Sequence, residues 1–146
     1  MKKKVLILGS SGMVGHQVCK YLDFCGEFEV FDIAHSRIIR DQTILIDATN
    51  RKLLEDKITQ IKPDFIVNCI GILIRGISGK EKMIYLNALL PHILDNISKF
   101  IGAKLIHIST DCVFSGKNGG YKEYDLPDGV GNYSITKQLG ELDNNN

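Results

Sequence analysis

Five short apolar runs divide this chain at regular intervals. A run that is continuous in apolar residues, rather than alternating, is typical of a strand buried on both faces. The predicted strands are residues 4–8, 28–32, 44–47, 65–70 and 104–108. Most of the connections are long enough to cross back over a sheet, as connections between parallel strands must.

Helical periodicity fills three of these connections. The predicted helices run from about Val14 to Phe24, through the apolar positions Leu53, Leu54, Ile58 and Ile61, and from about Glu81 to Phe100. Pro91 lies inside the third helix, where it should kink the helix or remove one backbone hydrogen bond. A glycine-bearing loop, Arg75 to Lys80, precedes that helix.

The alternation of strands and helices predicts an α/β fold. Right-handed crossovers give a Rossmann-like, doubly wound parallel sheet with strand order 3-2-1-4-5. In such a sheet a ligand binds beyond the carboxyl ends of the strands, where the order reverses between strands one and four. The 146 residues allow one core, so residues 1–146 are predicted to form one domain.

The composition bears on the partners, location and cysteine chemistry expected of this protein. The formal net charge is +1, which gives no reason to expect nucleic acid or an anionic membrane as partner. The apolar runs are too short for a membrane span, and no signal peptide is recognised at the start. The four cysteines show no C-x-x-C pairing, so reduced thiols, a cytoplasmic location and no metal site are predicted.

Three glycines spaced by two residues follow the first strand directly. Gly9, Gly12 and Gly15 lie in the segment Gly-Ser-Ser-Gly-Met-Val-Gly, just before the first predicted helix. Small residues let a backbone approach a pyrophosphate, and a helix N-terminus offers free N–H groups and a partial positive charge. The alternative is a tight strand-to-helix turn without a ligand; the strand before it and the helix after it favour nucleotide binding.

The ends of the later strands carry candidate cofactor contacts. Asp32 closes the second strand, where a carboxylate can accept hydrogen bonds from an adenosine ribose, although it could instead cap a turn. Ser36 and Arg37 follow it and could hold a 2′-phosphate, so the choice between NAD and NADP stays open. Asp47 ends the third strand, where a carboxylate can accept the adenine amino group, and Gly71 ends the fourth.

A phenol and an ammonium stand four residues apart near the end of the chain. On a helix, Tyr133 and Lys137 share one face. A phenol beside a cation is a tuned proton donor, because the cation favours the phenolate. With the hydroxyl of Thr110, the set suits proton transfer at a carbonyl or alcohol oxygen while hydride moves on carbon. An exposed helix pair without function is the alternative.

Several motifs in this order resemble one family. The matching segments are Gly9–Gly15, Asp32, Ile46–Ala48, Pro63–Asn68, Leu86–Ala88, His107–Gly116, Tyr133–Lys137 and Leu139–Glu141. They resemble the extended short-chain dehydrogenase/reductases, and among these the dTDP-4-dehydrorhamnose reductase-like proteins. Cys112 departs from the tyrosine usual at its position, and Asn68–Gly71 is bulkier than the usual run of small residues.

The resemblance implies a role for each matching residue. Thr110 would polarise the substrate carbonyl, with Asp111 near the substrate, Tyr133 as general acid, and Lys137 holding the nicotinamide ribose. The implied cofactor-binding residues are Gly9, Ser11, Gly12, Met13, Val14, Gly15, Asp32, Asp47, Ala48, Gly71, Ile72, Leu73, Tyr133 and Lys137. The cofactor would be NAD(P)H, with its preference unresolved.

The resemblance also implies an activity and partners. The expected activity is NAD(P)-dependent reduction of a nucleotide-linked 4-keto-6-deoxysugar for surface polysaccharide precursors. Another sugar-nucleotide epimerase or dehydratase reaction, or a non-catalytic dinucleotide-binding module, is the alternative. A nucleotide sugar would be the substrate, and a homodimer is compatible with the family. Because family members are considerably longer, the chain is expected to be an N-terminal part that stops before the substrate domain and is weakly active or inactive alone.

Overall fold

The chain folds into two compact units. The computed structural model describes residues 1–73 and 79–142, so most of the loop predicted from Arg75 to Lys80 lies outside the described residues. Within this description the first unit takes residues 1–70 and 93–108, and the second takes the remainder.

The first unit contains one five-stranded sheet. Its strands are β1 (Lys3–Leu8), β2 (Phe28–Ala34), β3 (Ile44–Leu45), β4 (Phe65–Asn68) and β5 (Lys104–His107). They lie in the order β3-β2-β1-β4-β5, and every pair is parallel. The predicted fold class and strand order are confirmed. β3 is shorter than predicted, so Asp47 lies beyond its end rather than in it.

The central strand β1 explains why the apolar runs are continuous. Val5 pairs with Val30 of β2 on one side and with Phe65 of β4 on the other. The residues from Val5 to Leu8 are all buried. A strand with neighbours on both edges and helices on both faces must be apolar at every position.

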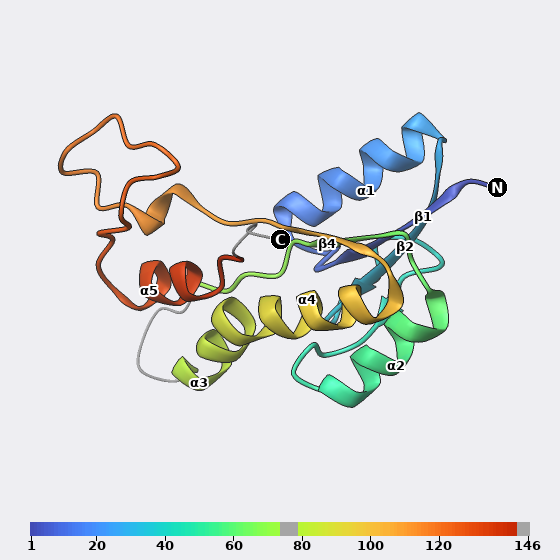
Figure 1. The fold of residues 1–146 in the computed structure, drawn as a ribbon. Helices are drawn as coiled ribbons and strands as arrows, with labels where there is room; N and C mark the ends of the chain where they lie inside the picture. Colours follow the sequence, from blue (N-terminus) through green and yellow to red (C-terminus); the bar gives the residue numbers. More distant parts are fainter. Residues whose placement is uncertain (74–78, 143–146) are drawn as a thin grey trace. The chain divides into compact units, whose positions relative to one another are not determined.

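Helices cover both faces of this sheet. α1 (Met13–Cys25) lies on one face, and α2 (Arg51–Ile61) lies on the other face with the part of α4 (Leu90–Ile101) that belongs to this unit (Figure 1). The side chain of Asn50 caps α2 by accepting a hydrogen bond from the Leu53 N–H at 3.2 Å.

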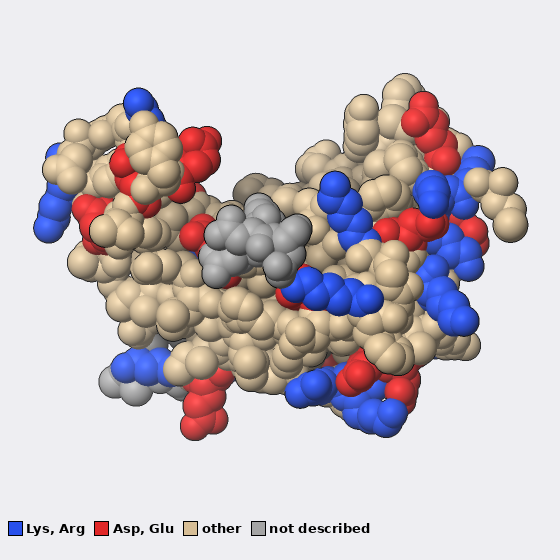
Figure 2. All heavy atoms as spheres, viewed as in Figure 1, with Lys and Arg blue, Asp and Glu red and all other residues tan. Residues whose placement is uncertain are grey.

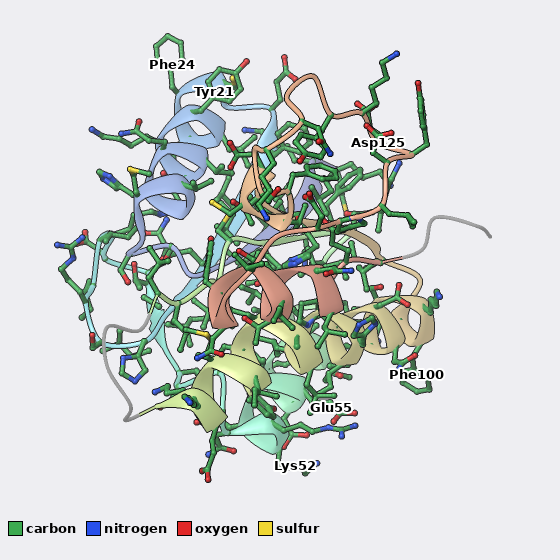
Figure 3. All side chains as sticks on the ribbon, turned by 90° about the vertical axis from the view of Figure 1, so that its left-hand side faces the viewer. Tyr21, Phe24, Lys52, Glu55, Phe100 and Asp125 are labelled. Atoms are coloured by element: carbon green, nitrogen blue, oxygen red, sulfur yellow. The ribbon has the colours of Figure 1, made fainter. Side chains whose placement is uncertain are left out.

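The faces of these helices that point away from the sheet carry exposed side chains. Tyr21 and Phe24 project from the end of α1, and Lys52 and Glu55 project from α2 (Figure 3). Tyr21 and Phe24 are 68% and 89% exposed. The apolar stripe of α1 instead buries Gly15 and Cys19.

The second unit is built from short helices. They are α3 (Lys80–Met83), a π-helical segment η1 (Ile84–Leu89), a 3₁₀ turn η2 (Asp111–Val113) and α5 (Asn132–Leu139). The sequence predicts one long helix from Glu81 to Phe100, whereas the structure divides this run into α3, η1 and α4. Pro91 has no N–H to donate one turn back, and the wider π turn falls immediately before it.

The surface in Figure 2 mixes charges of both signs, and the cysteines are free. On the face in Figure 2, Lys and Arg side chains lie among Asp and Glu side chains rather than in a patch of one sign. All four cysteines are free, and burial raises the pKa of Cys19 to about 12 and that of Cys69 to about 11. In the described part of the chain, the helices are too short or too polar to cross a bilayer.

Candidate functional site

The glycine turn after β1 is held by close backbone contacts. Gly9 has φ +79°, in the left-handed region that favours glycine, and its N–H donates to the carbonyl of Ile33 at 2.9 Å. A Cβ on Gly15 would lie 2.9 Å from the carbonyl carbon of Gly9 and 3.0 Å from Cα of Ser10. Only glycine therefore lets α1 start this close to the end of β1.

The start of α1 is left open. Gly12 is the N-cap residue, and no side chain caps this helix end. The first turn contains no acidic residue, and Gly12, Met13 and Val14 are exposed. The first N–H groups of a helix lack partners within the helix and carry its partial positive charge, so this end is suited to an anion.

Asp32 lies beside this turn, but its side chain is buried. Its carboxylate is completely buried: Oδ2 accepts a hydrogen bond from Ser10 Oγ at 2.7 Å, and Oδ1 lies 3.5 Å from Nε of Arg40. Arg40 also donates to the carbonyl of Val30 at 2.9 Å. Asp32 thereby ties the glycine turn to Arg40, and its contact with an adenosine ribose stays a prediction.

Asp47 and Ala48 follow β3 in the same unit. Asp47 Oδ1 accepts hydrogen bonds from the N–H and the Oγ1 of Thr49 at 3.0 and 2.8 Å, and Oδ2 lies 3.1 Å from Nε2 of His35. Ala48 is 6% exposed. These contacts fix the chain between β3 and α2 while leaving the Asp47 side chain partly exposed.

The loop after β4 is anchored in the second unit by one buried side chain. Asn87 of η1 accepts a hydrogen bond from the Ile72 N–H at 2.9 Å and donates to the Ile72 carbonyl at 3.0 Å. It also donates to Oγ1 of Thr136 in α5 at 3.3 Å. Asn87 thereby ties Ile72 to the helix that carries Tyr133, while Gly71 and Leu73 on either side are exposed.

Thr110 and Asp111 stand at the 3₁₀ turn. Thr110 is the N-cap of η2: its Oγ1 accepts from the Cys112 N–H at 3.2 Å and donates to Oδ1 of Asp111 at 3.3 Å. η2 packs against α5. The hydroxyl predicted as a carbonyl-polarising group therefore belongs to the same unit as Tyr133 and Lys137.

Tyr133 and Lys137 lie on α5, as the spacing predicts. The helix starts after Gly131, whose φ of +96° requires glycine. Thr136 Oγ1 donates back to the carbonyl of Asn132 at 2.7 Å. At the other end, a Cβ on Gly140 would overlap the carbonyl oxygen of Asn87, so this glycine lets the chain after α5 lie directly against η1.

Lys137 is the most deeply buried cation of the second unit among the described residues, at 2% exposure. Burial lowers the pKa of Lys137, and the charge of Glu141 partly opposes this by raising it. The Glu141 carboxylate accepts a hydrogen bond from Ser109 Oγ at 2.6 Å. The protonation of a lysine in this environment depends on burial and on the neighbouring charges.

The loop between Thr110 and Tyr133 is ordered by its own polar contacts. Asp128 accepts from the Ser115 N–H and Oγ, both at 2.7 Å, and from the Tyr121 hydroxyl at 3.0 Å. The Tyr121 ring stacks on Phe114 at 4.6 Å between centroids. The Gly129 N–H donates to the carbonyl of Val113 at 2.8 Å, which brings the chain back to η2 before α5 begins.

Comparison with known proteins identifies the family. The sequence model of the family described as RmlD substrate binding domain matches residues 2–143. This chain belongs to that family. The resemblance predicted from the motifs is thereby confirmed.

Two curated relatives match nearly the whole length of this chain. The chain is 29% identical over 141 residues, 94% of its length, to the spore coat polysaccharide biosynthesis protein SpsK of Bacillus subtilis, and covers 47% of that protein. It is 28% identical over 144 residues, 95% of its length, to methionine adenosyltransferase 2 subunit beta of Xenopus laevis, and covers 42% of it. The chain thus spans about half the length of the curated relatives it matches.

Two solved structures share the fold of this RmlD-family chain. One is a hypothetical dTDP-4-dehydrorhamnose reductase from Sulfolobus tokodaii, with a TM-score of 0.86 and 33% identity over 96% of this chain and 50% of that one. The other is dTDP-4-dehydrorhamnose reductase from Bacillus anthracis in complex with NADP, with a TM-score of 0.80 and 27% identity over 96% and 48% of the two chains.

Sequence reasoning missed three residues that organise this RmlD-family chain. Arg40 balances the buried charge of Asp32, while Asn87 and Thr136 connect η1 to α5. A buried asparagine in an apolar segment of a helix was the available signal for Asn87, because such a group needs hydrogen-bond partners. Nothing in the spacing of Asp32 and Arg40 indicates that they pair.

Substitution of Gly15 tests the packing of the glycine turn. Gly15→Ala should lower the free energy of unfolding by about 1–3 kcal/mol, because the new Cβ must displace the Gly9 backbone. Gly12→Ala is the matched comparison: its φ of −78° suits any residue, and its Cβ would lie 3.2 Å from the Gly9 carbonyl oxygen, a milder contact than that at Gly15. It should cost only about 0.5–1 kcal/mol as a poorer N-cap. Urea denaturation followed by circular dichroism measures both, and equal losses would contradict the packing argument.

Substitution of Asn87 tests the anchor of the loop after β4. Asn87→Ala should lower the free energy of unfolding by about 2 kcal/mol or more, because it leaves both backbone groups of Ile72 without their partner. Asn96→Ala, at an exposed position of α4, should change it by less than about 0.5 kcal/mol. A similar small loss in both variants, measured in the same urea titration, would show that the anchor is dispensable.

Proposed function

We propose that this chain is the dinucleotide-binding part of an NAD(P)-dependent reductase that acts on a nucleotide-linked 4-keto-6-deoxysugar in surface polysaccharide precursor synthesis. The observation that carries the proposal is the grouping of Thr110, Tyr133 and buried Lys137 in one unit of a member of the RmlD family. A dTDP-4-dehydrorhamnose reductase that is 27% identical to this chain is in complex with NADP.

The residues of the glycine turn fit the pyrophosphate of such a cofactor. The uncapped start of α1 offers the N–H groups of Met13, Val14 and Gly15, and the exposed Gly12 leaves no side chain in front of them. Gly9 and Ser11 complete the turn. Asp47 and Ala48 would lie beside the adenine, and Asp32, which accepts a hydrogen bond from Ser10 Oγ, would lie on the side of the adenosine ribose.

The second unit supplies the groups for chemistry at a carbonyl. When bound, NAD(P)H supplies the hydride. Tyr133 would donate the proton to the carbonyl oxygen of the sugar, Thr110 would donate a hydrogen bond to the same oxygen, and Asp111 would contact the sugar. Lys137 would bind the nicotinamide ribose, with Gly71, Ile72 and Leu73 lying along the nicotinamide.

The two alternatives differ in their support. Structural neighbours also include a sugar-nucleotide epimerase, ADP-L-glycero-D-manno-heptose-6-epimerase of Helicobacter pylori, at 16% identity, which supports the shared fold alone. The chain is 28% identical to a subunit of methionine adenosyltransferase and 29% identical to the polysaccharide protein. The second candidate is the non-catalytic dinucleotide-binding module that the resemblance implies. The presence of Thr110, Tyr133 and Lys137 together in one unit supports the enzyme.

The partners follow from the same proposal. A nucleotide sugar is the expected substrate. A homodimer stays a prediction; an apolar groove of about 240 Å³ in the second unit, lined by Met83, Ile84, Ile135 and Leu139 among others, is a surface that a second copy could cover.

The role of Tyr133 is tested by removing its hydroxyl. In the intact protein, Tyr133→Phe should lower turnover of a dTDP-linked 4-keto-6-deoxysugar by at least about 100-fold, because the proton donor is lost. The affinity for NADPH should stay within about twofold. Tyr124→Phe, at a tyrosine 76% exposed in the preceding loop, is the control and should be fully active. NADPH binding without turnover in the unsubstituted protein would favour the non-catalytic module.

The charge of Lys137 gives a pH test. If cationic Lys137 is required, activity is present below its pKa and falls as pH rises through it. Glu141→Gln removes the carboxylate that raises this pKa, so the alkaline limb of the kcat/KM profile should move to lower pH. Ser109→Ala removes the hydrogen bond but keeps the charge of Glu141, so its limb should move less. An unmoved limb in Glu141→Gln would contradict a charge role for Lys137.

A further inference from the structure

The loop between η2 and α5 contains the one Asn-Gly pair of the sequence, Asn118–Gly119. An asparagine side chain is lost as ammonia when the backbone nitrogen of the next residue attacks its amide carbon. A glycine at the next position favours this attack, because no Cβ hinders closure of the ring. Both residues are exposed, so water reaches the reacting groups.

The side-chain amide of Asn118 is free to react, although its backbone is held. Among the residues that the structure describes, the amide forms no hydrogen bond. The N–H of Asn118 donates to the hydroxyl of Tyr121 at 3.3 Å, and the N–H of Lys117 donates to Oγ of Ser115 at 3.3 Å. The chain is therefore fixed before Asn118, while the side chain can turn towards the following peptide.

The attacking nitrogen of Gly119 is also free. In the part of the chain that the structure describes, its N–H donates no hydrogen bond. Gly119 has φ +64° and Gly120 has φ +61°, and a Cβ on either would meet no atom within 4 Å. Two adjacent glycines with open space around them let the peptide after Asn118 reorient for the attack.

The same loop contains a matched contrast in Asp128–Gly129. An aspartate before glycine can close the same ring with loss of water. Here the carboxylate accepts hydrogen bonds from the N–H and Oγ of Ser115, both at 2.7 Å, and from the Tyr121 hydroxyl at 3.0 Å. The N–H of Gly129 donates to the carbonyl of Val113 at 2.8 Å. Both reacting groups are engaged, so this pair should be inert in the folded protein.

We propose that Asn118 is a site of spontaneous deamidation. The nitrogen of Gly119 gives its proton to hydroxide and forms a bond to Cγ of Asn118; the bond from Cγ to Nδ2 breaks, and Nδ2 takes up a proton and leaves as ammonia. Water then adds to one of the two carbonyl groups of the cyclic imide and opens it, which gives aspartate or isoaspartate at residue 118. Only water and hydroxide are consumed, and the proposal does not depend on the proposed function.

The product carries a new negative charge beside an existing one. The Tyr121 hydroxyl contacts both the Asn118 N–H and Oδ2 of Asp128, so residue 118 and Asp128 share this hydroxyl. Isoaspartate also adds a methylene group to the backbone before Gly119, and the open space at Gly119 and Gly120 can accommodate it. The modified protein should therefore stay folded and become more acidic.

The test is to age the purified full chain in mildly alkaline buffer and to analyse its peptides by mass spectrometry. The peptide that contains Asn118 should gain the mass difference between an amide NH₂ and a hydroxyl group. Fragmentation should place the change at Asn118 and identify isoaspartate, and ammonia should appear in equal amount. The reaction should be faster at higher pH, because the attacking nitrogen must lose its proton.

Variants at Asn118 show whether this residue is the source of the acidic species. Asn118→Gln should abolish the species on isoelectric focusing, because the longer side chain closes its ring poorly. Asn118→Asp should focus where the aged chain does and supplies the charge standard. Asn96→Gln, at an exposed position of α4, is the matched control and should accumulate the acidic species like the unsubstituted chain. Thermal melting of each variant checks that it is folded.

Two outcomes would overturn the proposal. One is an aged chain whose Asn118 peptide keeps its mass, or an acidic species that persists in Asn118→Gln. The other is isoaspartate formed at Asp128 as fast as at Asn118 in the folded chain, because the hydrogen bonds of the loop would then not control the reaction.

Discussion

The contact between Gly15 of α1 and the backbone of Gly9 is the constraint on which the candidate cofactor site depends. It brings the uncapped first turn of α1 to the end of the central strand β1, where its free N–H groups lie at the switch point of the sheet. A side chain at Gly15 would push the helix away and separate its positive end from that point. The buried carboxylate of Asp32, which contacts both Ser10 and Arg40, then holds the turn in place.

In the second unit, the side-chain amide of Asn87 holds the neighbouring segments together. Asn87 holds both backbone groups of Ile72 and also contacts Thr136, which lies between Tyr133 and Lys137 on α5. The position of the proposed proton donor is therefore coupled to the loop after β4. The π segment before Pro91 and the absence of a side chain at Gly140 let α5 and η1 approach closely enough for these contacts.

The sheet was predictable from the sequence because the apolar runs that indicate its strands are local patterns. Continuous apolar runs such as Val5–Leu8 report burial on both faces, and the strand order follows from the crossovers. The helical placement of Tyr133 and Lys137 was also predictable from their spacing. The burial of Asp32 was not, because it depends on Arg40, whose pairing no periodic pattern reveals. The π segment was missed for a similar reason: Pro91 indicates an irregularity but not its form.

The most direct test of the account is the amide NMR spectrum of the isotope-labelled chain titrated with NADPH. Binding of the pyrophosphate at the start of α1 predicts saturable shifts that are largest for the amide signals of Gly12, Met13, Val14 and Gly15. Saturable shifts elsewhere with these signals unmoved, or no shifts at all, would contradict the placement of the cofactor on the glycine turn.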